Sequence, residues 1–78
     1  MIKMEKNISY ELAVTPSQLK QILSLKAGDV ERKEELAEEI LQQNGYDTSV
    51  LSQYWDFTDW DEQSLTVTFR WSDNPADF

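Results

Sequence analysis

Apolar and polar residues alternate along two segments of the chain, and this pattern is typical of strands that bury one face. Every second residue of the segment 8–14 is apolar, and so is every second residue of the segment 65–71. A third segment, 50–60, is rich in β-forming residues and places Trp55 and Phe57 on one parity, which we take as the inward one. The chain is therefore expected to form three strands.

The last two strands should form a hairpin, because only a short polar stretch separates them. A three-residue loop at 62–64 would place Phe57 opposite Phe69 on the buried face. The same register would set Asp56 opposite Arg70. This pairing is a geometric prediction that a structure can test.

Two helices are predicted between the first and second strands. The first, 16–26, follows Thr15, a residue suited to cap a helix, and has a proline at its first position. The second, 30–44, follows Asp29 as a plausible cap and ends before Gly45, where a left-handed residue is favoured. The order strand, helix, helix, strand, strand predicts an α+β domain, with a three-stranded antiparallel sheet and both helices on one face.

The chain has 78 residues, which is enough for one domain with a small core. We treat residues 1–78 as a single acidic domain, in which 72–78 should form a loosely ordered tail. The hydrophobic fraction of 40% is too high for a disordered chain. Because the sequence has no cysteine and no run of about 18 apolar residues, a soluble cytoplasmic protein is expected.

Charge is distributed unevenly along the chain, whose formal net charge is -8. Residues 1–26 carry four lysines and two glutamates, whereas residues 27–78 carry three cations and thirteen acids. Binding of DNA, RNA or an anionic membrane requires a basic surface. The excess of acids therefore argues against direct binding of nucleic acid or membrane, and it favours basic protein surfaces as partners.

The sequence offers little catalytic chemistry. It has no histidine and no cysteine, which removes the usual proton shuttle and the best nucleophile at neutral pH. Acids near the hairpin end could pair as in glycoside hydrolysis or bind calcium, but chance pairs are common among fifteen acids, and the spacing of a calcium-binding loop is missing. No glycine-rich phosphate loop occurs. We therefore expect no enzymatic activity, no cofactor and no metal. The hairpin acids are Asp56, Asp59, Asp61 and Glu62.

The second predicted helix has two opposite faces. Leu36, Ala37, Ile40 and Leu41 form its apolar face. The other face is a ridge of carboxylates, which repel one another at three- and four-residue spacing and so do not favour the helix. A ridge of this kind can serve solubility, or it can dock on a basic groove. The acidic face comprises Glu31, Glu34, Glu35, Glu38 and Glu39.

A ridge with one or two carboxylates per turn, extended by acids of the hairpin, approximates the phosphate spacing of about 3.4 Å along one nucleic-acid strand. Tyr54 and Trp60, on the parity opposite to Trp55 and Phe57, would add aromatic anchors. In size, charge and lack of catalytic residues, the chain is similar to the small acidic inhibitors of phages and mobile elements, including anti-CRISPR and anti-restriction proteins. This resemblance is one of class, without a shared motif. It implies an inhibitor that covers a basic nucleic-acid-binding or assembly surface of another protein. The expected partner-binding residues are Glu31, Glu34, Glu35, Glu38, Tyr54, Asp56, Asp59, Trp60 and Asp61.

The alternative is a small structural or adaptor domain that forms a homodimer, or that docks through its open sheet face or a sheet edge. The acids would then serve solubility. Association would tolerate salt and would depend on Tyr10, Trp60 or Thr66.

Overall fold

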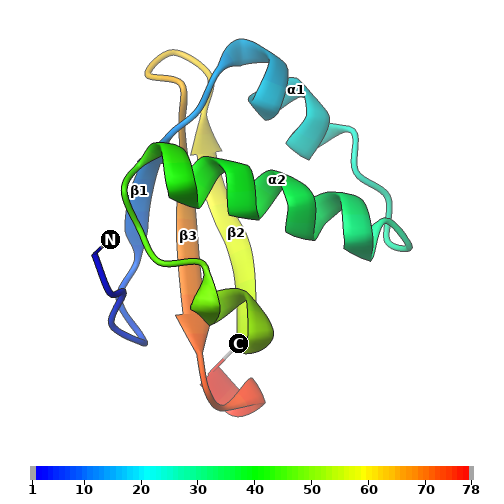
Figure 1. Ribbon diagram of the computed structural model, residues 1–78. Helices are drawn as coiled ribbons and strands as arrows, with labels where there is room; N and C mark the ends of the chain where they lie inside the picture. The colour runs from blue at the N-terminus through cyan, green and yellow to red at the C-terminus, as the bar shows by residue number, and fades with distance from the viewer. Residues whose placement is uncertain (1, 78) are drawn as a thin grey trace.

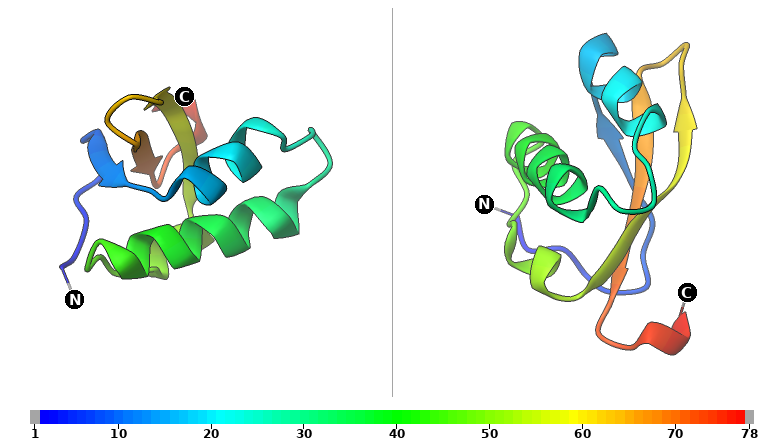
Figure 2. Two further views of the ribbon diagram at one scale, coloured as in Figure 1. Left: turned by 90° about the horizontal axis from the view of Figure 1, so that it is seen from above. Right: turned by 90° about the vertical axis from the view of Figure 1, so that its right-hand side faces the viewer.

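The computed structural model describes residues 2–77, which form three strands and two helices in the order expected from the sequence (Figure 1). The elements are β1 (Tyr10–Ala13), α1 (Pro16–Leu23), α2 (Val30–Gln43), β2 (Tyr54–Asp61) and β3 (Thr66–Ser72), with short 3-10 turns at Ser49–Ser52 and Pro75–Asp77. The strands form one antiparallel sheet in the order β1-β3-β2. Both helices lie on the same side of this sheet (Figure 2). The α+β fold predicted from the sequence is therefore confirmed.

The hairpin of β2 and β3 has the predicted register where the two strands are farthest from their turn. Phe57 lies opposite Phe69, and Asp56 lies opposite Arg70. The two phenylalanine rings meet edge to face, with their centroids 5.8 Å apart. Both predicted pairs are confirmed.

The turn of this hairpin differs from the prediction. It contains the four residues 62–65 rather than the three residues 62–64, so that β3 begins one residue later than expected. A bulge at Thr58 adds a residue to β2 and restores the predicted register beyond it. Between the bulge and the turn the parity of β2 is reversed, and Trp60 lies opposite the buried Val67. The side of the sheet inferred for Trp60 from simple alternation is therefore wrong.

Helix α1 begins as predicted but ends earlier. The Thr15 hydroxyl accepts a hydrogen bond from the Gln18 N–H (3.1 Å), and the Gln18 side chain accepts one from the Thr15 N–H (2.9 Å). This reciprocal pair is a capping box. The predicted end at residue 26 is wrong, because the chain tightens into a turn after Leu23, where the Leu25 N–H donates to the Ile22 carbonyl.

Helix α2 has nearly the predicted extent, and Asp29 occupies the predicted N-cap position. Its carboxylate accepts the N–H of Lys26 (3.1 Å) and no hydrogen bond from the helix, so it does not cap the helix through its side chain. At the other end, Asn44 follows the last helical residue and Gly45 has a φ of 80°. The predicted left-handed glycine is confirmed.

The hydrophobic core lies between the sheet and α2 (Figure 2). Phe57 and Phe69 are part of this core, whereas Trp55 and Trp71 are half-buried at its border. Met4, which precedes β1, is 1% exposed and packs into the same cluster. The burial of one face of α2 leaves its opposite face in solvent. The largest fully buried side chains are Phe69, Met4, Leu12, Leu36, Ile40, Leu41, Val67 and Ser72.

The C-terminal segment, which we expected to be loosely ordered, lies on the side of the sheet away from α2 (Figure 2). The hydroxyl of the buried Ser72 donates to the Asp77 carboxylate. Asp73 forms an ion pair of 2.9 Å with Lys6. Phe78, the last residue of the predicted tail, lies outside the described residues. Within residues 2–77, no helix combines the length and the apolar character needed to cross a membrane.

Candidate functional site

The outward face of α2 carries a row of glutamates, which we call the α2 ridge. The apolar side of this helix is buried against the sheet, so the opposite side faces solvent. All members of the ridge are exposed. The α2 ridge consists of Glu31, Glu34, Glu35 and Glu38.

Most of the α2 ridge has no counter-charge among the described residues 2–77. Glu35 lies 3.4 Å from the guanidinium of Arg32. Glu31, Glu34 and Glu38 accept no hydrogen bond and form no ion pair with any residue in the described part of the chain. These carboxylates are therefore available to a cationic partner.

The aspartates of β2 bind their own backbone. The Asp56 Oδ1 accepts hydrogen bonds from the Lys33 ammonium (2.7 Å) and from the Phe57 N–H (2.8 Å). The Asp59 Oδ1 accepts the Trp60 N–H at 2.8 Å. Because β2 is an edge strand, a strand added to this edge would have to accept hydrogen bonds from these same amides. The two aspartates thus occupy two backbone donors of this edge of the sheet.

Asp61 stabilises the turn between β2 and β3. Its Oδ1 accepts the N–H of Gln63 at 2.8 Å and that of Ser64 at 3.3 Å. These two backbone donors hold the pKa of Asp61 below its ordinary value, since they favour the charged carboxylate. Asp61 therefore has a local structural role.

The α2 ridge and the hairpin aspartates do not form one surface. Asp59 and Asp61 lie opposite Thr68 and Thr66 on the side of the sheet that the helices leave open. The α2 ridge faces solvent on the helix side of the sheet. The sheet and the buried side of α2 therefore separate the ridge from Asp59 and Asp61. Asp56 lies at the border, where it meets α2 through Lys33.

The two predicted aromatic anchors are exposed and lie at different points along β2. Tyr54 is 50% exposed at the start of the strand and lines an open pocket of about 430 Å³ together with Val30 and Pro75. Trp60 is 49% exposed and lines a second pocket of about 320 Å³, which Val30 also borders. Val30 itself is 66% exposed. These apolar side chains lie beside the first turn of α2, not on the ridge.

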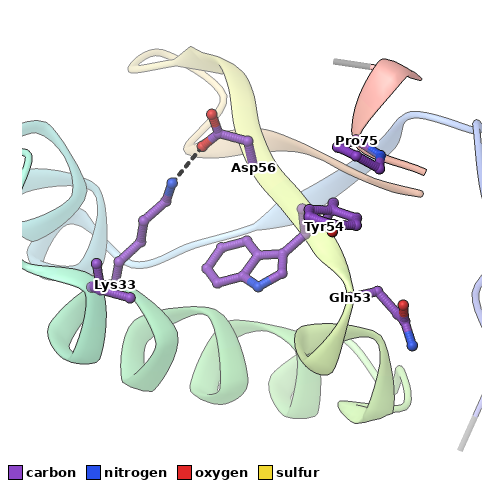
Figure 3. A pocket seen from close by; sticks show the side chains of 7 residues that line it. Lys33, Gln53, Tyr54, Asp56 and Pro75 are labelled. Carbon is purple, nitrogen blue, oxygen red and sulfur yellow. Dashed lines mark hydrogen bonds and ion pairs between the residues drawn. The ribbon is translucent and has the colours of Figure 1, made fainter. Parts of the chain in front are cut away.

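Lys33 is a site residue that the sequence did not reveal. Its ammonium pairs with Asp56, as Figure 3 shows. The same ammonium lies 5.1 Å from the centroid of the Trp55 ring. Lys33 follows Val30 by three residues and precedes Ala37 by four, so it falls on the sheet-facing side of the helix. The sequence feature that could have predicted this role is a lysine on the apolar side of a helix that is otherwise rich in glutamate.

No group of three or more histidine, cysteine, aspartate or glutamate side chains suited to a metal ion occurs within residues 2–77. Comparison with protein-family models, with curated proteins and with solved structures finds no match to this chain.

Proposed function

We propose that this protein is a non-catalytic, cytoplasmic inhibitor that binds a nucleic-acid-handling protein. In this proposal, the α2 ridge docks on a basic nucleic-acid-binding or assembly surface and excludes the natural ligand. The supporting observation is that Glu31, Glu34 and Glu38 are exposed and have no partner within residues 2–77. Like charges at this spacing cost an isolated helix about 0.2–0.5 kcal/mol per pair, so helix stability alone does not favour them.

The charge density of the α2 ridge supports nucleic-acid mimicry. From Glu31 to Glu38 the helix rises by about 10 Å, and four carboxylates lie along this length. Their average axial spacing is close to the phosphate spacing of about 3.4 Å along one strand of a duplex. A channel of lysines and arginines that holds a nucleic-acid strand can therefore also accept this helix.

We restrict the proposed acidic docking surface to α2. Asp59 and Asp61, which we expected to extend the ridge, lie on the other side of the sheet and bind their own backbone. We therefore leave Asp59 and Asp61 out of the proposed acidic docking surface, which consists of the α2 ridge.

Side chains that occupy backbone groups at both edges of the sheet weigh against the alternative of an adaptor that docks by strand addition. Asp56 and Asp59 occupy amides of the β2 edge. At the β1 edge, the Asn44 amide accepts the Ala13 N–H and donates to the Ala13 carbonyl, both at 3.0 Å. Neither edge offers these groups to a second chain.

The proposal can be tested by affinity capture from a host lysate at about 50 mM salt, followed by elution with duplex DNA or with RNA. We expect a retained protein that nucleic acid displaces, and that the ridge triple variant Glu31→Gln, Glu34→Gln, Glu38→Gln fails to retain. The matched control, Glu5→Gln, Glu11→Gln, Glu62→Gln, removes the same charge from other exposed positions. Equal loss in both triple variants, or a partner that nucleic acid does not displace, contradicts the proposal.

A further inference from the structure

One groove follows the β2 edge past the first turn of α2. The pockets beside Tyr54 and beside Trp60 share Val30, Lys33 and Asp56 as lining residues. Lys33 and Asp56, whose ion pair Figure 3 shows, line both pockets, so the two pockets meet at this ion pair. We call this feature the β2 groove.

The β2 groove concentrates exposed apolar surface. Val30, Tyr54 and Trp60 are three of the six large hydrophobic residues that are exposed within the described chain. Their gathering around one groove is typical of a recognition surface, whereas single exposed hydrophobic residues are ordinary. The charge of the chain, -8, makes a basic partner the favoured occupant.

Recognition in this groove is expected to come from side chains, because two amides of the strand beside it already have acceptors. The Phe57 and Trp60 amides already donate to the carboxylates of Asp56 and Asp59. An occupant would otherwise have to break both bonds before it could pair with β2.

The centre of the groove already holds a cation between an aromatic ring and a carboxylate. The Lys33 ammonium lies 5.1 Å from the Trp55 centroid and 2.7 Å from the Asp56 Oδ1. Trp55 is fixed in place, since its ring stacks on Phe69 with centroids 5.5 Å apart and its Nε1–H donates to the Leu51 carbonyl. The Trp55 ring and the Asp56 carboxylate, which we call the cation receptor, are therefore preorganised around a positive charge.

An arginine suits this receptor better than the lysine that occupies it. A guanidinium is planar, so it can stack on an indole while it donates two hydrogen bonds to one carboxylate. The Lys33 side chain is 34% exposed and the Asp56 side chain 51% exposed, and the flexible lysine stem can move its ammonium into water.

We propose that the β2 groove binds an arginine-bearing, extended segment of the partner protein, whose guanidinium displaces Lys33 from Trp55 and Asp56. Apolar residues on either side of that arginine cover Val30, Tyr54 and Trp60. Lys33 acts as an internal competitor, which lowers the apparent affinity for any weaker cation. This inference rests on the proposed function only in taking the partner to be a basic protein.

The test uses the acetylated, amidated peptide Leu-Arg-Leu, and the same peptide with citrulline, a neutral analogue of arginine, as its matched control. Binding is followed through the NMR signals of the tryptophan indole and backbone amides. We expect shifts at Trp55 and Trp60 with the arginine peptide and none with the citrulline peptide. Shifts confined to other residues, or equal binding of both peptides, would overturn the proposal.

Two variants test whether the arginine takes the place of Lys33 beside Asp56. Lys33→Met removes the competitor and keeps the aliphatic stem, so it should bind the arginine peptide about tenfold more tightly. Asp56→Asn removes the carboxylate and should bind it about tenfold more weakly. Weaker binding by Lys33→Met would overturn displacement, because Lys33 would then belong to the binding site.

The ridge triple variant distinguishes this inference from the proposed function. It should bind the arginine peptide as the unaltered protein does, because the α2 ridge does not line the groove. If the ridge triple variant loses the peptide, the peptide binds by general charge attraction and the groove proposal fails. If the ridge triple variant fails to retain the captured partner but still binds the peptide, the result bears only on the docking role of the α2 ridge.

Discussion

The α2 ridge and the aspartates of the β2–β3 hairpin are both rows of exposed carboxylates, but they use their charge differently. Asp56, Asp59 and Asp61 each accept at least one backbone N–H, so their oxygens stabilise the edge and the turn. Glu31 and Glu34 have no partner within residues 2–77. Equal charge in the sequence therefore corresponds to a structural role in one region and to an available surface in the other.

The largest effect on stability should come from Asp56. Replacing Asp56 by alanine leaves the Phe57 N–H and the Lys33 ammonium without their acceptor. Because both groups can reach water, we expect a loss of about 1 kcal/mol in the free energy of unfolding, measured with urea. A loss below the error of that measurement would show that Asp56 is as free as the ridge.

The Asp59→Ala substitution should have a smaller effect of the same sign. Only the Trp60 N–H loses its acceptor, and Trp60 lies at an exposed edge. We expect a loss of about 0.5 kcal/mol in urea unfolding, and a greater tendency to associate because an edge amide becomes available. Size-exclusion chromatography at increasing concentration measures that association, and an unchanged elution volume would limit the role of Asp59 to stability.

Asp61 should make the hairpin sensitive to acid. Its pKa lies below the ordinary value of 3.8, because the N–H groups of Gln63 and Ser64 donate to the carboxylate. In the unfolded chain Asp61 titrates at the ordinary value, so its stabilisation is fully present above that pH and is lost as pH falls through the folded pKa.

The measurement is the melting temperature from neutral to acidic pH for the unaltered protein, Asp61→Asn and Glu62→Gln. Asp61→Asn should flatten the acid-side decline, and Glu62→Gln should not change it. Identical curves for all three proteins would contradict the structural role of Asp61.

The smallest effect, and one of opposite sign, should come from the ridge. Glu34→Gln removes the repulsion of Glu34 by Glu31 and Glu38, at three- and four-residue spacing. We expect the free energy of unfolding to rise by about 0.3 kcal/mol, and this gain should decrease at high salt. A clear loss of stability would mean that Glu34 has a structural partner after all.

The fold was largely predictable because each element has a local signal. Strict alternation of apolar and polar residues predicted β3. Gly45, a residue type that favours the left-handed conformation after a helix, predicted the end of α2. The hairpin register followed from pairing the aromatic faces, with Phe57 opposite Phe69. These signals depend on neighbours along the chain, which a sequence displays directly.

The site was less predictable because it depends on contacts that sequence spacing does not show. The bulge at Thr58 moves Trp60 to the other side of the sheet, and no residue type in that segment demands a bulge. The backbone bonds of Asp59 became visible only once β2 was an edge strand. The pairing of Lys33 with Asp56 joins residues that are far apart in the chain.

The most direct test of the central claim is the salt dependence of affinity for the captured partner, compared between the unaltered protein and the two triple variants. The ridge triple variant, Glu31→Gln, Glu34→Gln, Glu38→Gln, should bind at least about thirtyfold more weakly at low salt and should show a much shallower decline with salt. The control, Glu5→Gln, Glu11→Gln, Glu62→Gln, should keep most of the affinity and the steep decline. Equal behaviour of the two variants would show that only net charge matters and would contradict a docking role for the α2 ridge.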